Sequence, residues 1–234
     1  MSDPIPPDVI TETSLNRQLP EIGREQIIKA LDLAVLKPDA RLEDVTNAAR
    51  VVEDMGLASL CVASYNVAVA KQITSRVCSV IGFPHGNMSP QTKYLEAAAA
   101  IEDGATELDV VMNYGRFLEG RDTVVVQELG RIVQLAHTKK VLVKAILETC
   151  YYQPGQIIEA CRLCVDCGVD FVKPSTGFAF GGATPWAVEL MLEAVKGAAQ
   201  VKASGGIKTY ADAALYLGLG CTRLGSSRCL DLLP

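Results

Sequence analysis

The chain is poor in the residues that most often serve in nucleophilic triads and metal centres. Its 234 residues include two histidines, His85 and His137, and one tryptophan, Trp186. The histidines lie in separate segments, so a Ser–His–Asp arrangement or a histidine-rich metal site has little material. His85 stands in G-F-P-H-G-N, where it could contact a substrate or simply be solvated. The chemistry is therefore expected to depend on other side chains.

An excess of basic residues is also missing. The sequence holds 22 Lys and Arg against 27 Asp and Glu, which gives a formal net charge of −5 and a pI of about 5.2. Such a chain has no overall positive field to hold a polyanion. Nucleic acid is therefore not expected as a partner.

Long apolar runs are absent too, although the mean hydropathy is +0.22. The apolar residues come in short bursts such as Val77–Phe83 and Val141–Leu147. These are far below the roughly 20 residues needed to cross a bilayer. The beginning of the chain is rich in proline and does not resemble a secretory signal. We expect a soluble, cytoplasmic protein with no membrane partner.

Cysteine is plentiful, with eight residues, but the lack of an export signal favours reduced thiols over disulfides. Cys161, Cys164 and Cys167 form a C-x2-C-x2-C run, which could suggest a zinc or iron–sulfur site. Their segment has a helical pattern that spreads the three side chains over a broad face, and no fourth ligand follows at the usual spacing. We expect packing in the interior and no metal site. Cys61 is expected to pack in the core or to line a pocket.

Short apolar runs typical of strands alternate with longer stretches of helical period along the whole chain. The expected strands are Leu31–Val35, Ser59–Ser64, Val77–Phe83, Glu107–Asn113, Val141–Glu148, Asp170–Pro174, Gln200–Ser204 and Thr222–Ser226. They are almost continuously apolar, as parallel strands are when both faces are covered. Eight such strands predict an α/β fold, a closed (β/α)8 TIM barrel. A doubly wound open sheet is the alternative, but its G-x-G-x-x-G signature is missing.

The helical segments define the domain organisation. They are expected at Arg24–Ala30, Leu42–Met55, Val67–Ser75, Pro90–Asp103, Asp122–His137, Pro154–Cys167, Pro185–Gly197 and Tyr210–Leu217. Only Arg228–Pro234 follows the last strand, so the last helix must be very short or absent. Residues 1–23 are predicted to form an N-terminal arm, and residues 24–234 a single catalytic barrel domain.

Three lysines interrupt neighbouring apolar strands. Lys144 lies in V-L-V-K-A-I-L, Lys173 in D-F-V-K-P-S and Lys202 in Q-V-K-A-S-G-G. A single such lysine can extend its ammonium group to solvent. Three that point into one barrel would crowd one another, and crowding and desolvation both depress a lysine pKa. A neutral amine is a nucleophile toward carbonyls, and barrel enzymes place their chemistry at the C-terminal ends of strands, where Lys173 and Lys202 stand.

Two aspartates also interrupt apolar strands: Asp109 in E-L-D-V-V-M-N and Asp32 in A-L-D-L-A-V-L. An unpaired charge would be costly there, so each needs a partner. Either carboxylate could form a purely structural ion pair with a strand lysine, or it could move protons beside an amine. A pair of acids is also typical of glycoside hydrolysis, but that chemistry gives the lysines no role.

Glycine-rich turns follow the last two strands. Gly205 and Gly206 precede Ile207-Lys208-Thr209 at the start of a helix, and Gly225 precedes Ser226 and Ser227. Glycines allow backbone N–H groups to approach an anion, and this position is a recurrent phosphate site in barrel enzymes. The alternative is ordinary turn formation. Because both turns have this character, we favour phosphate binding.

A family resemblance connects these segments. The segments that carry it are L-D-L-A-V-L-K-P-D-A, V-I-G-F-P-H-G, G-A-T-E-L-D-V-V-M-N, V-K-A-I-L-E-T-C, D-F-V-K-P-S-T-G-F, G-G-A-T, V-K-A-S-G-G-I-K-T and T-R-L-G-S-S. In this order they closely resemble the deoxyribose-phosphate aldolase family, from about Leu31 to Ser227. The resemblance implies a (β/α)8 barrel and a class I aldolase that works without metal or cofactor. It also implies the reaction, cleavage of 2-deoxy-D-ribose 5-phosphate to D-glyceraldehyde 3-phosphate and acetaldehyde.

The resemblance also implies residue roles. Lys173 would be the Schiff-base lysine, Lys202 the neighbouring cation and proton-transfer partner, and Asp109 the acid/base group, with Lys144 and Asp32 supporting them. The substrate and its phosphate would be bound by Ser175, Thr176, Gly177, Ser204, Gly205, Gly206, Gly225, Ser226 and Ser227. The implied partners are a phosphosugar and acetaldehyde, and a homodimer is a possible assembly.

The sequence departs from the family pattern at several points. Pro174 follows the nucleophile where a small hydroxyl residue is usual, and its ring removes an N–H. Ala34 replaces a common threonine, and the chain ends without a longer segment that closes in tyrosine in some members. Two alternatives therefore stay open: a barrel that binds phosphosugars without catalysis, and a Schiff-base aldolase with a different aldehyde pair.

Overall fold

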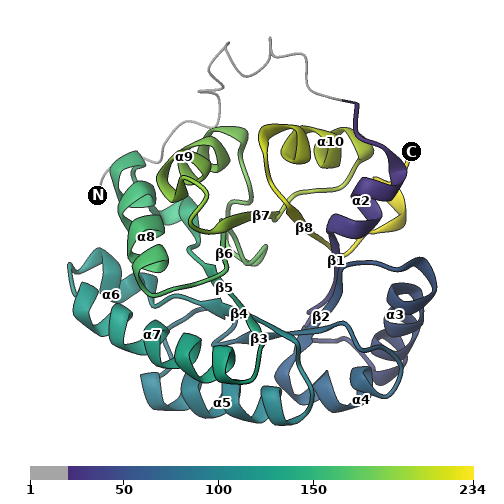
Figure 1. Ribbon diagram of the computed structural model, residues 1–234, viewed down its shortest axis with the longest axis horizontal. Coiled ribbons are helices and arrows are strands. Elements are labelled where there is room, and N and C mark those ends of the chain that lie inside the picture. The colour runs from purple at the N-terminus through teal and green to yellow at the C-terminus, as the bar shows by residue number, and fades with distance from the viewer. Residues whose placement is uncertain (1–20) are drawn as a thin grey trace.

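Eight short apolar segments form parallel strands that close into a barrel (Figure 1). The computed structural model describes residues 21–234, and most of the expected arm over residues 1–23 lies outside the described residues. The strands are β1 (Leu31–Val35), β2 (Ser59–Ala63), β3 (Val77–Ile81), β4 (Glu107–Val111), β5 (Leu142–Ile146), β6 (Phe171–Lys173), β7 (Gln200–Ser204) and β8 (Arg223–Ser226). Each pairs with the next in the chain, and β8 pairs with β1. The expected (β/α)8 barrel is confirmed.

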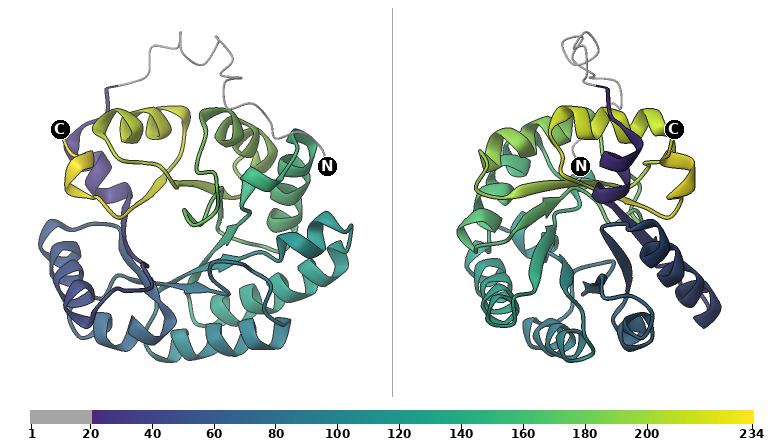
Figure 2. Two further views of the ribbon diagram at one scale, coloured as in Figure 1. Left: turned by 180° about the vertical axis from the view of Figure 1, so that it is seen from behind. Right: turned by 45° about the vertical axis from the view of Figure 1, so that its right-hand side comes forward.

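Helices form a ring outside the strands, and Figure 2 shows the same enclosure from two further directions. They are α2 (Arg24–Ala30), α3 (Leu42–Met55), α4 (Val67–Lys71), α5 (Pro90–Glu102), α6 (Tyr114–Leu118), α7 (Asp122–Thr138), α8 (Pro154–Asp166), α9 (Pro185–Val195) and α10 (Tyr210–Leu219). Their ends follow local chemistry: the Ser89 hydroxyl accepts from Thr92 N–H at the start of α5, with Pro90 in the first turn. None of the described helices is long and apolar enough to cross a membrane.

Several element boundaries differ from the expected ones by a few residues. The strand expected over Val77–Phe83 ends at Ile81, because Gly82 turns the chain at a φ of 64°. The helix expected over Val67–Ser75 ends at Lys71. The short helix α6 was not expected; the Asn113 side chain accepts from Arg116 N–H and starts it directly after β4.

The packed apolar core lies between the strands and the helices. Side chains alternate along each strand, so one set faces the helices and the other faces the lumen. Leu60, Leu108 and Val172 belong to the outer set and are fully buried. The apolar group on the lumen side is small and contains Cys61, Cys78 and Val80. The stability of the barrel therefore depends mainly on its outer layer, which leaves the lumen for polar groups.

The chain closes on itself beside β1. After β8 the described chain forms one 3-10 turn, Leu230–Leu232, in place of a full last helix. Helix α2 lies on the same flank, next to α10 (Figure 1). The Tyr210 hydroxyl donates to Ile22 C=O at 2.9 Å, and Arg24 donates to Pro234 C=O at 3.3 Å. These contacts join both ends of the described chain to the barrel.

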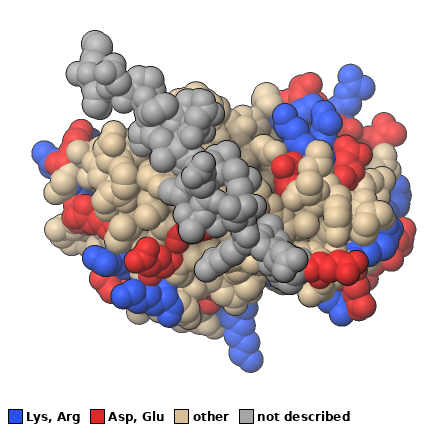
Figure 3. All heavy atoms as spheres, turned by 90° about the horizontal axis from the view of Figure 1, so that it is seen from above, with Lys and Arg blue, Asp and Glu red and all other residues tan. Residues whose placement is uncertain are grey.

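Figure 3 shows one outer face of the molecule. Basic and acidic side chains lie interspersed on it, around the residues drawn in grey. This mixture agrees with the small formal net charge of −5. The face shown therefore offers no broad field of one sign.

Candidate active site

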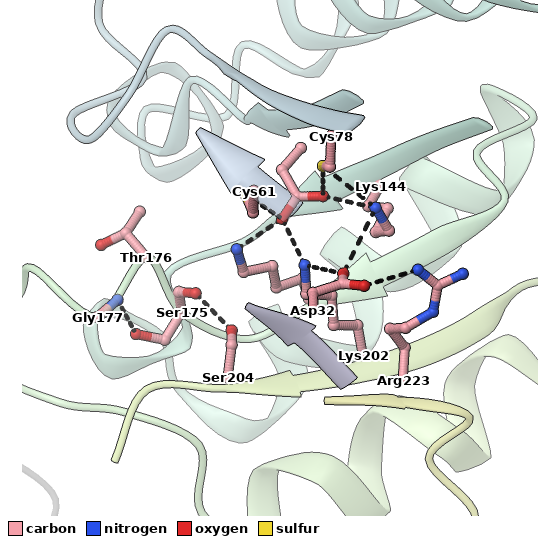
Figure 4. A network of polar contacts seen from close by, with 12 residues as sticks. Asp32, Cys61, Cys78, Lys144, Ser175, Thr176, Gly177, Lys202, Ser204 and Arg223 are labelled. Atoms are coloured by element: carbon pink, nitrogen blue, oxygen red, sulfur yellow. Dashed lines mark hydrogen bonds and ion pairs between the residues drawn. The ribbon is translucent and has the colours of Figure 1, made fainter. Parts of the chain in front are cut away.

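The lumen contains a layer of charged side chains from six of the strands. Lumen-facing positions of these strands hold Asp32 (β1), Glu107 and Asp109 (β4), Lys144 (β5), Lys173 (β6), Lys202 (β7) and Arg223 (β8). Figure 4 shows Asp32, Lys144, Lys202 and Arg223 directed toward one another. Most of these side chains are almost completely shielded from solvent. Burial of so many charges is tolerated because each one lies beside an opposite charge.

Asp109 lies at the centre of this layer. Its Oδ2 accepts from Lys173 Nζ at 2.7 Å and from Lys202 Nζ at 2.8 Å, while its Oδ1 accepts from Lys144 Nζ at 2.9 Å. Burial opposes ionisation of Asp109, but the three ammonium groups outweigh it and hold the pKa well below its ordinary value. Asp109 is therefore an anion within direct reach of the Lys173 amine.

Asp32 supports the network from β1. Its Oδ2 lies 2.5 Å from Lys202 Nζ and 3.8 Å from Lys144 Nζ, and its Oδ1 accepts from Arg223 at 2.8 Å. Burial again opposes ionisation, and the three cations again outweigh it, so the pKa of Asp32 is lowered. Lys202 is thus held between two carboxylates, those of Asp32 and Asp109.

The expected depression of the lysine pKa values by crowding is wrong for two of the three lysines. Burial lowers the pKa of Lys202, but Asp109 and Asp32 outweigh it and raise that pKa above its ordinary value. The pKa of Lys144 is raised well above its ordinary value for the same reason, with Asp109 as its strongest partner. Crowding does not decide these pKa values, because carboxylates from β1 and β4 lie directly beside both ammonium groups. Lys144 and Lys202 are therefore charged groups in the lumen.

Two charged residues that complete this layer were not singled out in the sequence. The Glu107 carboxylate lies 2.5 Å from Lys144 Nζ and 2.9 Å from Arg223. Arg223 also contacts Asp32 and so joins three strands. The sequence spacing could have indicated both residues, because residues i and i+2 of a strand share a face. Glu107 stands two positions before Asp109, and Arg223 stands two positions before Gly225.

A cavity of about 720 Å³ opens above the charged layer, at the C-terminal ends of the strands. Asp32, Cys61, Lys173 and Lys202 line it, whereas Asp109 and Lys144 lie beneath its surface. The same lining also includes Thr176, Gly177, Ser204, Gly205, Gly206, Gly225, Ser226 and Ser227. Ser175 is buried and does not line the cavity, and His85 is exposed outside it. The expected catalytic and phosphate-binding residues thus line one cavity, except for Asp109, Lys144 and Ser175, which are buried.

The glycine-rich turn after β7 is shaped by close backbone contacts. Gly205 and Gly206 have φ angles of 84° and 83°, a region that favours glycine. A Cβ on Gly205 would lie 2.9 Å from Gly182 Cα and from Ser175 Oγ. The N–H of Ala183 donates to the carbonyls of Ser204 and Gly205, both at 3.0 Å. Both glycines are therefore needed for the shape of this turn, which forms one wall of the cavity.

Several hydroxyl groups in this wall already have protein partners. Ser204 Oγ donates to Ser175 C=O at 2.7 Å, and Ser226 Oγ donates to Ile207 C=O at 2.9 Å. The Thr176 hydroxyl donates to Glu148, which also accepts from Thr176 N–H at 3.1 Å. Glu148 was not singled out in the sequence, although it is the acid of I-L-E-T directly after β5. These side chains hold the wall in shape, which leaves backbone N–H groups and Ser227 to face a ligand.

Comparison with known proteins places the chain among aldolases. The profile of the DeoC/LacD family aldolases matches residues 26–217. The chain belongs to this family. The deoxyribose-phosphate aldolase of Thermococcus gammatolerans is 42% identical over 86% of this chain and 92% of its own length. That of Treponema denticola is 39% identical over 86% of this chain and 95% of its own.

A solved structure agrees with the sequence comparison. The tetrameric deoxyribose phosphate aldolase from Aeropyrum pernix matches 90% of this chain and 90% of its own, with a TM-score of 0.81 at 33% identity. The expectation of an aldolase, and hence of a carbon–carbon lyase, is confirmed.

Proposed function

We propose that this aldolase cleaves 2-deoxy-D-ribose 5-phosphate to D-glyceraldehyde 3-phosphate and acetaldehyde through a Schiff base on Lys173. One observation supports this most: Lys173 lines the cavity, and its Nζ lies 2.7 Å from the Asp109 carboxylate. The glycine-rich turns line another part of the same cavity, where a phosphate would fit. The curated relatives named above are deoxyribose-phosphate aldolases, which supports the same substrate.

The cations of the lumen differ in how many carboxylates they contact. Among the described residues, the layer has four cations, Lys144, Lys173, Lys202 and Arg223, against three carboxylates, Asp32, Glu107 and Asp109. Lys144, Lys202 and Arg223 each contact at least two carboxylates, whereas Lys173 contacts Asp109 alone. Lys173 is therefore the cation with the fewest ion pairs in this layer.

The reaction then follows from the geometry. The Lys173 amine adds to the sugar aldehyde, and the carbinolamine loses water to give an iminium ion. The iminium withdraws electrons as the bond between C2 and C3 breaks, C3 becomes the aldehyde of glyceraldehyde 3-phosphate, and an enamine stays on Lys173. Protonation of the enamine and hydrolysis release acetaldehyde. Asp109 and Lys202 are placed to transfer the protons of these steps, directly or through a water.

Pro174 does not remove Lys173 from this arrangement. The backbone carbonyl groups of Lys173 and Pro174 are both hydrogen-bonded to the segment after β5. Lys173 C=O accepts from Leu147 N–H at 2.9 Å, and Pro174 C=O accepts from Thr149 N–H at 2.8 Å. An N–H at position 174 is not needed for either contact. This supports a working aldolase over the alternative of a barrel that only binds phosphosugars.

Borohydride trapping tests the proposal. The protein is incubated with acetaldehyde or deoxyribose 5-phosphate, reduced, digested and mapped by mass spectrometry. We expect a stable adduct on Lys173, its loss in Lys173→Ala, and its retention in the control Lys139→Ala, an exposed lysine at the end of α7. If the folded protein forms no adduct, the result would favour the alternative of a barrel that binds phosphosugars without catalysis.

A substrate comparison addresses the remaining alternative. Steady-state rates with deoxyribose 5-phosphate should exceed those with ribose 5-phosphate and with unphosphorylated deoxyribose. Equal rates would favour a different aldehyde pair. We also propose that the reaction serves the breakdown of deoxyribose phosphates and that copies of the chain assemble, at least as a homodimer. Light scattering of the purified protein tests the assembly.

A further inference from the structure

Two thiols flank Asp109, and the proposed reaction uses neither of them. Cys61 on β2 and Cys78 on β3 are register partners on adjacent parallel strands. Cys78 Sγ lies 3.1 Å from Asp109 Oδ1, and Cys61 Sγ lies 4.0 Å from Asp109 Oδ2. Figure 4 shows both thiols beside the charged network. The structure thus places a pair of thiols next to the carboxylate that organises the lumen.

The pair meets the spatial requirement for a disulfide. Adjacent strands lie about 4.7–4.9 Å apart, within the range of about 4.4–6.8 Å found between the Cα atoms of bonded cysteines. Cys61 and Cys78 both point into the lumen, and their Sγ atoms and an Asp109 oxygen all lie within 4.8 Å of one another. Rotation of the two side chains can therefore bring the sulfur atoms together.

The two thiols differ in access and acidity. Both thiols are almost completely buried, but Cys61 is part of the cavity lining and Cys78 is not. The neighbouring Cys78 side chain lowers the pKa of the Cys61 thiol, and burial raises the pKa of the Cys78 thiol well above its ordinary value. Because the thiolate is the reactive form, Cys61 is the thiol that reacts first with a small molecule in the cavity.

We propose that hydrogen peroxide converts Cys61 and Cys78 into a reversible disulfide that switches the active site off. The Cys61 thiolate attacks one peroxide oxygen, the O–O bond breaks, and a sulfenic acid forms as hydroxide leaves and takes up the thiol proton as water. The Cys78 sulfur then attacks the Cys61 sulfur. The S–S bond forms, the S–O bond breaks, and the hydroxyl leaves as water with the Cys78 proton. Two thiols are oxidised, and one peroxide is reduced to two waters.

The disulfide would disturb Asp109 directly. It removes the thiol proton that Cys78 directs at Asp109 Oδ1, and it moves the sulfur that lies 3.4 Å from Lys144 Nζ. Asp109 in turn holds Lys173, so the amine and its proton acceptor no longer keep their geometry. A disulfide is returned to two thiols by exchange with a reducing dithiol. The switch is therefore reversible.

Peptide mapping after peroxide treatment tests the proposal. The reduced full-length protein is treated with hydrogen peroxide, its remaining thiols are alkylated, and it is digested with trypsin without reductant. Cleavage after Arg50, Lys71, Arg76 and Lys93 places Cys61 in residues 51–71 and Cys78 in residues 77–93, with one cysteine in each peptide. We expect these two peptides to be cross-linked. We also expect cleavage of deoxyribose 5-phosphate to fall about tenfold or more, as for a lost hydrogen bond to a charged group, and to recover with dithiothreitol.

Cysteine variants separate this pair from the other thiols. Cys61→Ser and Cys78→Ser should each abolish the cross-link, whereas Cys167→Ala, which removes a partly exposed thiol at the end of α8, should leave the peroxide response unchanged. Each rate is compared with that of the same variant before oxidation. Oxidised protein without the cross-link, or with the cross-link and an unchanged rate, would overturn the proposal.

The aldolase reaction and the disulfide have separate readouts. The loss of rate rests on the proposed function, but the cross-link does not. If the reduced protein does not cleave deoxyribose 5-phosphate, the proposed function fails, and the peptide map still decides whether the two thiols form a disulfide.

Discussion

At the scale of single residues, Asp109 holds the candidate site together. Three ammonium groups and the Cys78 thiol surround its carboxylate, and solvent does not reach it. A neutral side chain of the same size would leave Lys144, Lys173 and Lys202 with one counter-charge fewer. Loss of this one charge should therefore affect both proton transfer and the stability of the lumen.

The variant Asp109→Asn should retain the shape of the side chain and lose its function. We expect kcat to fall by about 10²–10⁴-fold, the usual contribution of a positioned acid or base. The rate is measured as glyceraldehyde 3-phosphate released from deoxyribose 5-phosphate. Asp103→Asn, at an exposed carboxylate at the end of α5, serves as the control and should keep the wild-type rate. A kcat of Asp109→Asn equal to that of the control would remove Asp109 from the mechanism.

The lowered pKa values of Asp32 and Asp109 make stability sensitive to acid. Both carboxyl groups have lower pKa values in the folded protein than the value of about 3.9 in an unfolded chain. The unfolded chain therefore binds protons first as the pH falls, so the stabilisation is complete above that value and is lost below it. We expect the urea midpoint, followed by Trp186 fluorescence, to fall as the pH is lowered below about 4. The fall should be smaller in Asp109→Asn, and equal falls would contradict this account.

At the scale of elements, a buried ion pair joins two helices to the end of β4. Lys93 on α5 contacts Glu128 on α7 at 2.5 Å and donates to Val111 C=O at 2.8 Å. Burial lowers the pKa of Lys93 and raises that of Glu128, despite their mutual attraction. The pair fixes the C-terminal end of the strand that supplies Asp109.

Removal of one member should cost more than removal of both. We expect Lys93→Met to lower the free energy of unfolding by about 3–5 kcal/mol, because it leaves the Glu128 carboxylate buried and unpaired. The double variant Lys93→Met/Glu128→Met should recover much of that loss. Urea titration of wild type, both single variants and the double variant measures the coupling. Additive losses in the double variant would show that the two side chains act independently.

The sequence predicts elements better than it predicts contacts between them. Apolar runs and caps indicated all eight strands, and the charged residues within those runs indicated Lys173, Lys202 and Asp109. The protonation of Lys144 and Lys202 was not predictable in the same way, because it depends on carboxylates that reach them from β1 and β4. Those distances are set by the closure of the barrel, and periodicity along one strand does not report them.

At the scale of the whole molecule, a 3-10 turn follows β8 and packs on the flank of the barrel. The 3-10 turn Leu230–Leu232 covers the flank beside α10 and α2, and Leu232 is fully buried there. The neighbouring Leu230 is 62% exposed. The short C-terminal segment thus contributes Cys229 and Leu232 to the outer core, and Leu233 packs against it.

A pair of leucine variants measures this contribution. Leu232→Ala should lower the free energy of unfolding by about 2–5 kcal/mol, the usual cost of a large-to-small change in a core. Leu230→Ala, two positions away and exposed, should change it by less than about 0.5 kcal/mol. Chemical denaturation of both variants gives the comparison. Similar values for the two would mean that the C-terminal turn does not seal the barrel.

The contact between Arg24 and Pro234 makes the barrel suitable for circular permutation. Because the two ends of the described chain lie side by side, a short linker could join them without crossing the molecule. New ends could be opened at Gly120, an exposed glycine between α6 and α7 with open space around it. The rearranged chain would begin with α7 and keep every strand pairing, including the pairing of β8 with β1. In such a chain the order in which the half-barrels emerge during synthesis would be reversed, while the lumen would be assembled from the same strands.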